Sequence, residues 1–126
     1  MSGILAKEAY EILQLNDNYI MVDVRTKEEW AAIGTPSVKN IVRLSTHFRP
    51  DMSVNPDFIA QLDEKIQDKS KYLLFMCRTN GRSSYAAAQA VANGYANSLV
   101  VMDGFEGTEF GPGWKNSNLP FETYEK

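Results

Sequence analysis

The feature that most limits the fold of this chain is a short apolar segment that ends at a cysteine. Residues 71–76 are almost wholly apolar, and Cys77, which follows them, is the only cysteine of the chain. An apolar run of this length, bounded by turn residues, is typical of a strand buried on both faces of a parallel sheet. After a loop over 78–82, the alanine-rich residues 83–92 predict a helix that a serine can cap. The predicted order is therefore strand, cysteine, loop, helix.

This order favours a reactive cysteine. In an open parallel sheet ligands bind beyond the carboxyl ends of the strands, and a helix N-terminus there stabilises the thiolate form of a cysteine. Arg78 and Arg82 add positive charge, and Asn80-Gly81 tolerates the positive φ that turns N–H groups inward as an anion nest. We interpret Cys77 as a nucleophile in an anion-binding loop. The alternative is a buried structural cysteine, which the two arginines and the tight loop disfavour.

The segment from Cys77 to Ser83 resembles the active-site loop of the rhodanese (sulfurtransferase) family. That loop opens with Cys, often continues with Arg, and closes with Arg-Ser. Cys77 through Arg82 counts six residues, the length of the sulfurtransferase loop, whereas dual-specificity phosphatases of the same fold have one residue more. Where the family usually has Gly, this chain has Asn80, the non-glycine residue that best tolerates the left-handed region.

Other segments extend the resemblance from about residue 4 to residue 121. Residues 23–30 resemble the first signature of the family, in which Asp23 and Arg25 brace the active-site region without acting as the nucleophile. Asp103-Gly104 resembles a family turn with two glycines, and Trp114 resembles the tryptophan that closes the domain. The alternative for Asp23 and Arg25 is that they only fix the turn after their strand.

The rest of the chain predicts alternating strands and helices. Helices are expected over 4–15, 26–32 and 55–66, further strands over 19–25 and 97–102, and a loop that leads into a short strand over 33–42. Thr26 and Glu29 have the spacing of a capping box, and Asn55-Pro56 is a helix start signal. The prediction is an α/β fold of the rhodanese type, with a mostly parallel central sheet, helices on both faces, and one domain over 1–126.

Composition excludes several classes of function. The net charge of −3 gives no basis for binding nucleic acid or an anionic membrane. One Cys and one His exclude an intrachain disulfide and make a zinc site improbable, so we expect no metal or other cofactor. The first residues lack the pattern of a signal peptide, so we expect a cytoplasmic protein, or a periplasmic one if a leader was removed. The oligomeric state stays open.

The resemblance implies transfer of sulfane sulfur through a persulfide on Cys77. The donor would be a small anion such as thiosulfate, polysulfide or a persulfide, and the acceptor a thiol, cyanide or a protein. The terminal sulfur would be held by the backbone N–H groups of Arg78, Thr79, Asn80, Gly81 and Arg82. The alternatives are a partner-specific sulfur relay, a phosphatase or arsenate reductase on the same fold, and an inactive domain. His47, the only histidine, is a candidate partner of Cys77 or simply a solvent-facing loop residue.

Overall fold

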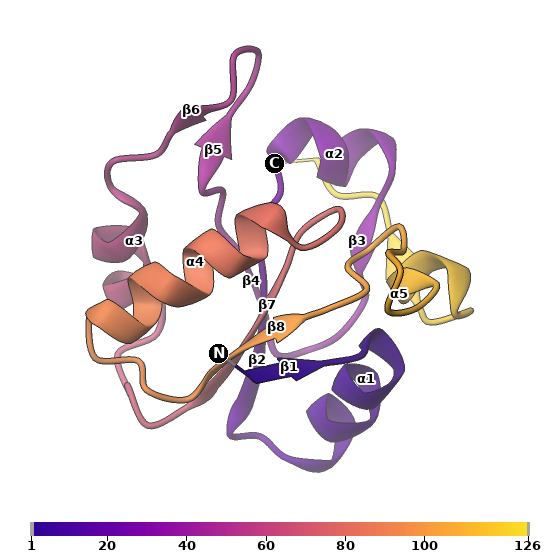
Figure 1. The fold of residues 1–126 in the computed structure, drawn as a ribbon, viewed down its shortest axis with the longest axis horizontal. Helices are drawn as coiled ribbons and strands as arrows, with labels where there is room; N and C mark the ends of the chain where they lie inside the picture. The colour runs from indigo at the N-terminus through magenta and orange to yellow at the C-terminus, as the bar shows by residue number, and fades with distance from the viewer. Residues whose placement is uncertain (1, 126) are drawn as a thin grey trace.

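A five-stranded parallel sheet forms the centre of the computed structural model, which describes residues 2–125 (Figure 1). Met1 and Lys126, the end residues of the predicted domain, lie outside the described residues. The strands of the sheet, in spatial order, are β1 (Ser2–Ile4), β8 (Ser98–Val101), β7 (Tyr72–Met76), β2 (Tyr19–Asp23) and β4 (Ile41–Arg43). All four pairings are parallel, so the carboxyl ends of these strands meet at one edge.

Helices cover both faces of this sheet. They are α1 (Ala6–Leu15), α2 (Lys27–Ala32), α3 (Phe58–Lys65), α4 (Gly81–Ala92) and α5 (Gly113–Asn116). Two short antiparallel pairs complete the fold: β3 (Thr35–Pro36) with β9 (Phe121–Glu122), and β5 (His47–Phe48) with β6 (Ser53–Val54). The β5–β6 pair is a hairpin that projects from the body near the N-terminal end of α4 (Figure 1).

The central strand β7 separates two apolar clusters. Leu73 and Phe75 pack with residues of α3 and α4, whereas Leu74 and Met76 pack with residues of α1 and α5. Because successive side chains of a strand point to opposite faces, one strand supplies both cores. The prediction of an α/β fold with a mostly parallel sheet and helices on both faces is confirmed.

Two helices away from the Cys77 loop begin later than predicted. The helix predicted over 4–15 begins at Ala6, and Ile4 belongs to β1, an edge strand that pairs only with β8. A strand of three residues is too short to show alternation, and its partner lies far away in the sequence. The helix predicted from Asn55 begins at Phe58. Asn55 is instead 4% exposed, and its amide donates to the Ser45 carbonyl at 2.9 Å, which ties the turn to the preceding loop.

Thr26 and Glu29 form the predicted capping box at the start of α2, and Trp30 is buried. Within residues 2–125, no helix has the length and apolar character needed to cross a membrane.

Candidate functional site

Cys77 follows the last residue of β7, at the carboxyl edge of the sheet where ligands bind in folds of this type. Its side chain is 1% exposed, and its Sγ lies 3.4 Å from the hydroxyl oxygen of Ser83. That hydroxyl donates to the Asn80 carbonyl at 3.1 Å. The thiol is thus enclosed by the loop that follows it and by the first turn of α4.

Helix α4 begins earlier than the sequence suggested. Its first residue is Gly81 and its N-cap is Asn80, so Ser83 lies inside the helix and does not cap it. Asn80 has a φ of −147°, and neither it nor Gly81 is among the described residues with positive φ. The predicted nest of left-handed residues is therefore wrong. The helix start itself, four residues after Cys77, brings N–H groups to the loop.

The backbone N–H groups of this loop are free to bind an anion. No hydrogen bond between residues 2–125 uses the N–H groups of residues 78–82 as donors. Residues 78, 79 and 81 are exposed, and the first N–H groups of a helix lack intrahelical partners, so these donors are accessible from solvent. Unpaired donors at a helix N-terminus can bind an anion, and these belong to the loop that joins Cys77 to α4.

A turn after β8 supports the loop from the opposite side. The N–H groups of Phe105 and Glu106 donate to the carbonyls of Cys77 at 2.9 Å and Arg78 at 3.1 Å. Gly104 has a φ of +62°, and a Cβ there would overlap the carbonyl oxygens of the loop. Only glycine fits this close approach of two backbones.

Asp103, which stands where the family usually has the first glycine of this turn, has a separate task. Its carboxylate accepts hydrogen bonds from the N–H groups of Ala6 at 2.8 Å and Gly113 at 3.0 Å. These residues begin α1 and α5, so one buried carboxylate satisfies two helix starts.

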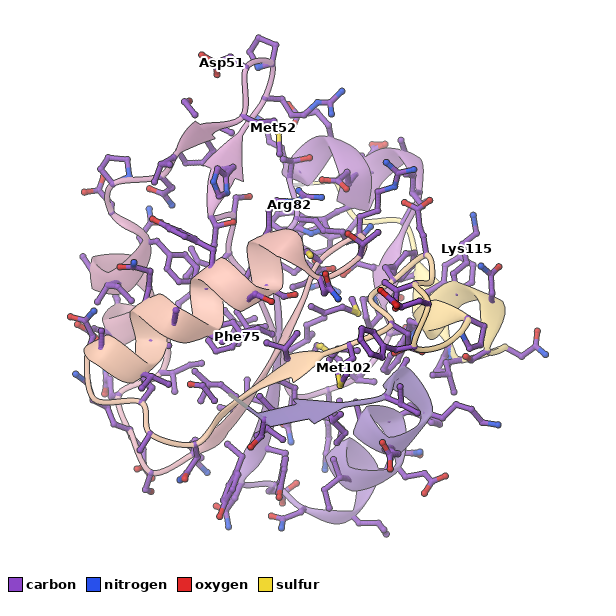
Figure 2. The ribbon with its side chains drawn as sticks, in the orientation of Figure 1. Asp51, Met52, Phe75, Arg82, Met102 and Lys115 are labelled. Atoms are coloured by element: carbon purple, nitrogen blue, oxygen red, sulfur yellow. The ribbon has the colours of Figure 1, made fainter. Side chains whose placement is uncertain are left out.

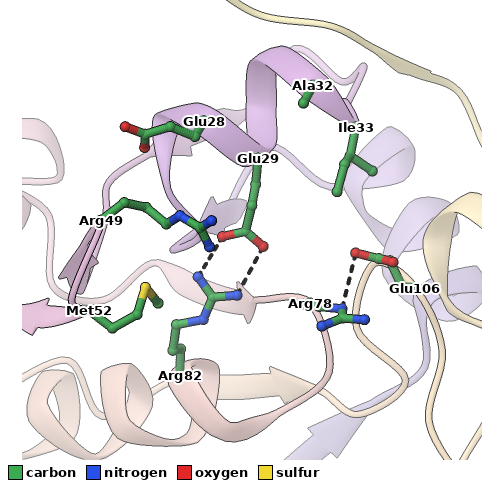
Figure 3. A pocket seen from close by; sticks show the side chains of 9 residues that line it. All are labelled: Glu28, Glu29, Ala32, Ile33, Arg49, Met52, Arg78, Arg82 and Glu106. Atoms are coloured by element: carbon green, nitrogen blue, oxygen red, sulfur yellow. Dashed lines mark hydrogen bonds and ion pairs between the residues drawn. The ribbon is translucent and has the colours of Figure 1, made fainter.

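A pocket of about 450 Å³ opens above the loop (Figure 3). Helix α2, the hairpin tip, the loop and the turn after β8 each contribute to its wall. Its lining residues are Glu28, Glu29, Ala32, Ile33, Arg49, Met52, Arg78, Arg82 and Glu106. Figure 2 shows Arg82 at the N-terminal end of α4, on the same side of the molecule as Met52 of the hairpin.

Both loop arginines are paired with glutamates in this pocket. Arg82 donates two hydrogen bonds to the carboxylate of Glu29, at 2.7 and 3.0 Å. Nε of Arg78 lies 3.3 Å from the Glu106 carboxylate (Figure 3). The positive charge that the sequence places at Arg78 and Arg82 is therefore partly offset by a carboxylate beside each guanidinium.

The pairing has a clear effect on ionisation. Burial opposes the charged form of Glu29, but hydrogen bonds from Arg82 and from the Thr26 N–H outweigh it and lower the pKa of Glu29 to about 2. Burial also opposes the charge of Arg82, yet the bond to Glu29 raises the pKa of Arg82. The ion pair is therefore fully formed at neutral pH.

Asp23 and Arg25 lie behind the loop and form a buried ion pair, with Nη2 of Arg25 2.9 Å from Asp23. The hydroxyl of Thr35 donates to the same carboxylate at 2.7 Å. The guanidinium stacks over the Phe105 ring at 4.1 Å, and the N–H of Phe105 donates to Cys77. Phe105 thus connects the ion pair to the Cys77 loop.

His47 does not reach Cys77. It lies on β5, packs against Tyr85 with ring centroids 5.4 Å apart, and its Nδ1 is 2.9 Å from the Thr46 hydroxyl. Burial and the charge of Arg82 lower the pKa of His47, so the ring is neutral at pH 7. A Cys–His pair is absent from the hydrogen bonds of residues 2–125.

Sequence reasoning missed Glu29 and Glu106 as pocket residues. Glu29 was predicted only as a capping-box residue, and Glu106 only as part of a turn. The available signal was that Glu29 lies on the helix directly after β2. The carboxyl end of β2 lies beside that of β7, which leads to Cys77.

Comparison with known proteins agrees with this geometry. A family model described as the STR4 middle domain matches residues 2–126. The uncharacterized protein RP600 of Rickettsia prowazekii is 38% identical over 97% of this chain and 98% of its own length. The chloroplastic rhodanese-like domain-containing protein 4 of Arabidopsis thaliana is 28% identical over 92% of this chain and 24% of that protein.

Solved structures share the fold. The crystal structure of Rv0390 from M. tuberculosis has a TM-score of 0.86 and 30% identity, and the match covers 98% of each chain. The polysulfide-sulfur transferase homodimer from Wolinella succinogenes has a TM-score of 0.76 and 24% identity, over 97% of this chain and 78% of that one. The fold and the cysteine loop define a rhodanese-type α/β protein. This chain belongs to the rhodanese-like family, and it matches the related family described as the STR4 middle domain.

Proposed function

We propose that this protein is a sulfurtransferase that carries sulfane sulfur on Cys77. The observation that carries the proposal is the set of unpaired N–H groups at residues 78–82, next to the Cys77 thiol. A persulfide ends in an anionic sulfur, and backbone donors at a helix N-terminus stabilise such a charge. The Cys77 thiol donates to the Ser83 hydroxyl oxygen at 3.4 Å, and that hydroxyl donates its own proton to the Asn80 carbonyl.

The reaction has two half-steps. In the first, the Cys77 thiolate attacks the outer sulfur of the donor, the donor's sulfur–sulfur bond breaks, and sulfite or a thiolate leaves with the bonding electrons. In the second, cyanide or an acceptor thiolate attacks the terminal sulfur of the persulfide and releases the Cys77 thiolate. No external oxidant is needed, because sulfane sulfur passes between thiolates without net electron loss.

Family membership supports this proposal. Rhodanese-like proteins include sulfurtransferases, and the structural neighbour from Wolinella succinogenes is named a polysulfide-sulfur transferase. We expect the reaction to take place in the cytoplasm, where thiols are kept reduced and can serve as acceptors.

Thiocyanate formation tests the proposal. Wild-type protein is incubated with cyanide and either thiosulfate or polysulfide, beside Cys77→Ser and a Ser84→Ala control at a half-buried position on α4. Because cyanide takes sulfur from polysulfide without protein, each rate is compared with a protein-free sample. We expect turnover above that rate in the wild type and the control and none above it in Cys77→Ser. Equal thiocyanate formation in wild type and Cys77→Ser would contradict the proposal.

A partner-specific sulfur relay is the second candidate, favoured by the 1% exposure of Cys77. A relay uses the same persulfide but receives it from a protein donor. Slow loading by every small donor, together with fast loading by a protein persulfide, would favour the relay over the free enzyme.

A further inference from the structure

The pocket above the Cys77 loop has no net formal charge. Its charged lining residues are three arginines and three glutamates: Arg49, Arg78, Arg82, Glu28, Glu29 and Glu106. Arg82 is held in an ion pair at 2.7 Å, and Arg78, which is 65% exposed, lies 3.3 Å from the Glu106 carboxylate. Arg49 and Glu28 make no ion pair with another described residue, and Figure 3 shows the Arg49 guanidinium directed toward Glu29 and the Glu28 carboxylate directed away from it.

Neutral lining disfavours a dianion. Thiosulfate carries two negative charges and must lose water to reach an enclosed thiolate, which is itself negative. An arginine held 3 Å from a carboxylate presents a dipole whose field falls off faster than that of a free charge. The backbone N–H groups of the loop can offset one negative charge at the sulfur end. The one lining arginine without an ion pair among the described residues is Arg49, which lies on the hairpin and not on the loop.

The apolar part of the lining favours an organic donor. Ala32 and Ile33 of α2 and Met52 of the hairpin line the same pocket. The volume of about 450 Å³ lies within the range of pockets for small organic molecules and is far larger than an inorganic anion requires. The carbon atoms of an organic donor would therefore be buried against these side chains, whereas thiosulfate has no apolar surface to bury.

We propose that this site prefers a low-molecular-weight organic persulfide, R–S–SH, as donor and that Glu106 and Glu29 disfavour thiosulfate by pairing with the loop arginines. This inference rests on the proposed sulfurtransferase function. A bond forms between Cys77 Sγ and the outer sulfur, and the donor's sulfur–sulfur bond breaks. The thiolate R–S⁻ leaves with the electron pair, and the proton stays on the transferred sulfur. The organic group R lies against Ile33 and Met52.

The test is the rate of sulfur loading onto Cys77 from cysteine persulfide and from thiosulfate, followed by intact mass. Each rate constant is divided by that of the same donor with free 2-mercaptoethanol, because persulfides are intrinsically reactive. We expect the corrected rate to favour cysteine persulfide by roughly tenfold or more, as one extra apolar contact can provide.

Glu106→Gln tests the cause of this preference. It frees Arg78, so we expect thiosulfate loading to rise roughly two- to fivefold at low ionic strength, and to rise less in high salt. The matched control is Glu64→Gln, which makes the same change of net charge at an exposed position on α3 and should alter neither rate. The ratio of the corrected loading rates for cysteine persulfide and thiosulfate is measured on the wild-type protein. The proposal therefore stays testable if Glu106→Gln folds poorly.

The outcomes separate this inference from the function on which it rests. Equal or better corrected loading by thiosulfate would overturn the donor preference while leaving the sulfurtransferase function intact. An unchanged thiosulfate rate in a folded Glu106→Gln variant would overturn the role of the glutamate. If neither donor leaves sulfur on Cys77, the sulfurtransferase function itself fails, and the donor preference fails with it.

Discussion

The ion pair between Glu29 and Arg82 gives a stability prediction with a defined pH range. Glu29→Gln removes the charge but keeps a residue that can complete the capping box of α2. The pKa of Glu29 is about 2 in the folded protein, against 4.5 without its partners. At about 1.36 kcal/mol per pKa unit, this difference sets an upper limit of about 3.4 kcal/mol. The side chain is only 12% exposed but borders an open pocket, so solvent screening reduces our expectation to about 1.5–2 kcal/mol.

The sign of the pH dependence follows from proton binding. Because the folded-state pKa is lower, the unfolded chain binds more protons between pH 2 and pH 4.5. The contribution of Glu29 is therefore complete above about pH 5 and is lost as the pH falls toward 2. Asp17 and Asp68 also have lowered pKa values, held down by hydrogen bonds to Lys39 and to Ser70, but these effects cancel between wild type and variant.

Urea unfolding followed by circular dichroism at pH 7, 5, 4 and 3 measures this difference. We expect Glu29→Gln to be less stable than wild type at pH 7 and the gap to close at low pH. Glu28→Gln is the matched control: the residue is exposed, lies in the same first turn of α2, and makes no ion pair with a described residue, so its change should stay within about 0.5 kcal/mol. A gap for Glu29→Gln that is the same at every pH would refute the reasoning.

Three further variants test the support of the Cys77 loop. Asp23→Asn should destabilise the protein by about 3–5 kcal/mol at pH 7, because the charge of Arg25, which is 0% exposed, loses its partner. Chemical denaturation measures this change. A loss of less than about 1 kcal/mol would contradict the buried ion pair. Gly104→Ala should lower the free energy of unfolding by about 2 kcal/mol or more and should also lower sulfur-transfer activity. The added Cβ would overlap the Arg78 carbonyl, and the positive φ is strained for alanine. A variant with the stability and activity of the wild type would contradict the close approach. Asn80→Ala should slow loading of Cys77 and lower the stability by about 1 kcal/mol or less. The loss is small because the Asn80 amide makes one long hydrogen bond of 3.5 Å, to the Met102 carbonyl after β8. Loading rates and thermal unfolding measure the two effects, and a severe loss of stability would contradict this minor structural role.

Part of the fold follows directly from local sequence. Strand β7, which is followed by Cys77, was predicted from the length and pattern of its apolar run alone. Both apolar clusters depend on that strand. The capping box of Thr26 and Glu29 was also predicted, since it needs only a spacing of three residues. Such features depend on neighbours in the chain.

The parts that the sequence could not predict depend on distant contacts. Glu29 binds Arg82, which lies 53 residues later, and no local spacing announces that bond. Strand β1 is defined by its pairing with β8 and not by its own three residues. The conformation of Asn80 was inferred from its tolerance of positive φ, but the helix begins there with ordinary negative φ. A residue's tolerance of a conformation does not establish that the loop adopts it.

The central claim is that Cys77 carries transferred sulfur, and intact-protein mass spectrometry tests it most directly. Purified protein is exposed to thiosulfate, polysulfide or cysteine persulfide, and then to cyanide, beside a Cys77→Ala variant. The account predicts a gain of the mass of one sulfur atom in the wild type, its removal by cyanide, and no gain in Cys77→Ala. A wild-type protein that gains no sulfur from any of these donors, or a Cys77→Ala variant that gains it equally, would contradict the account.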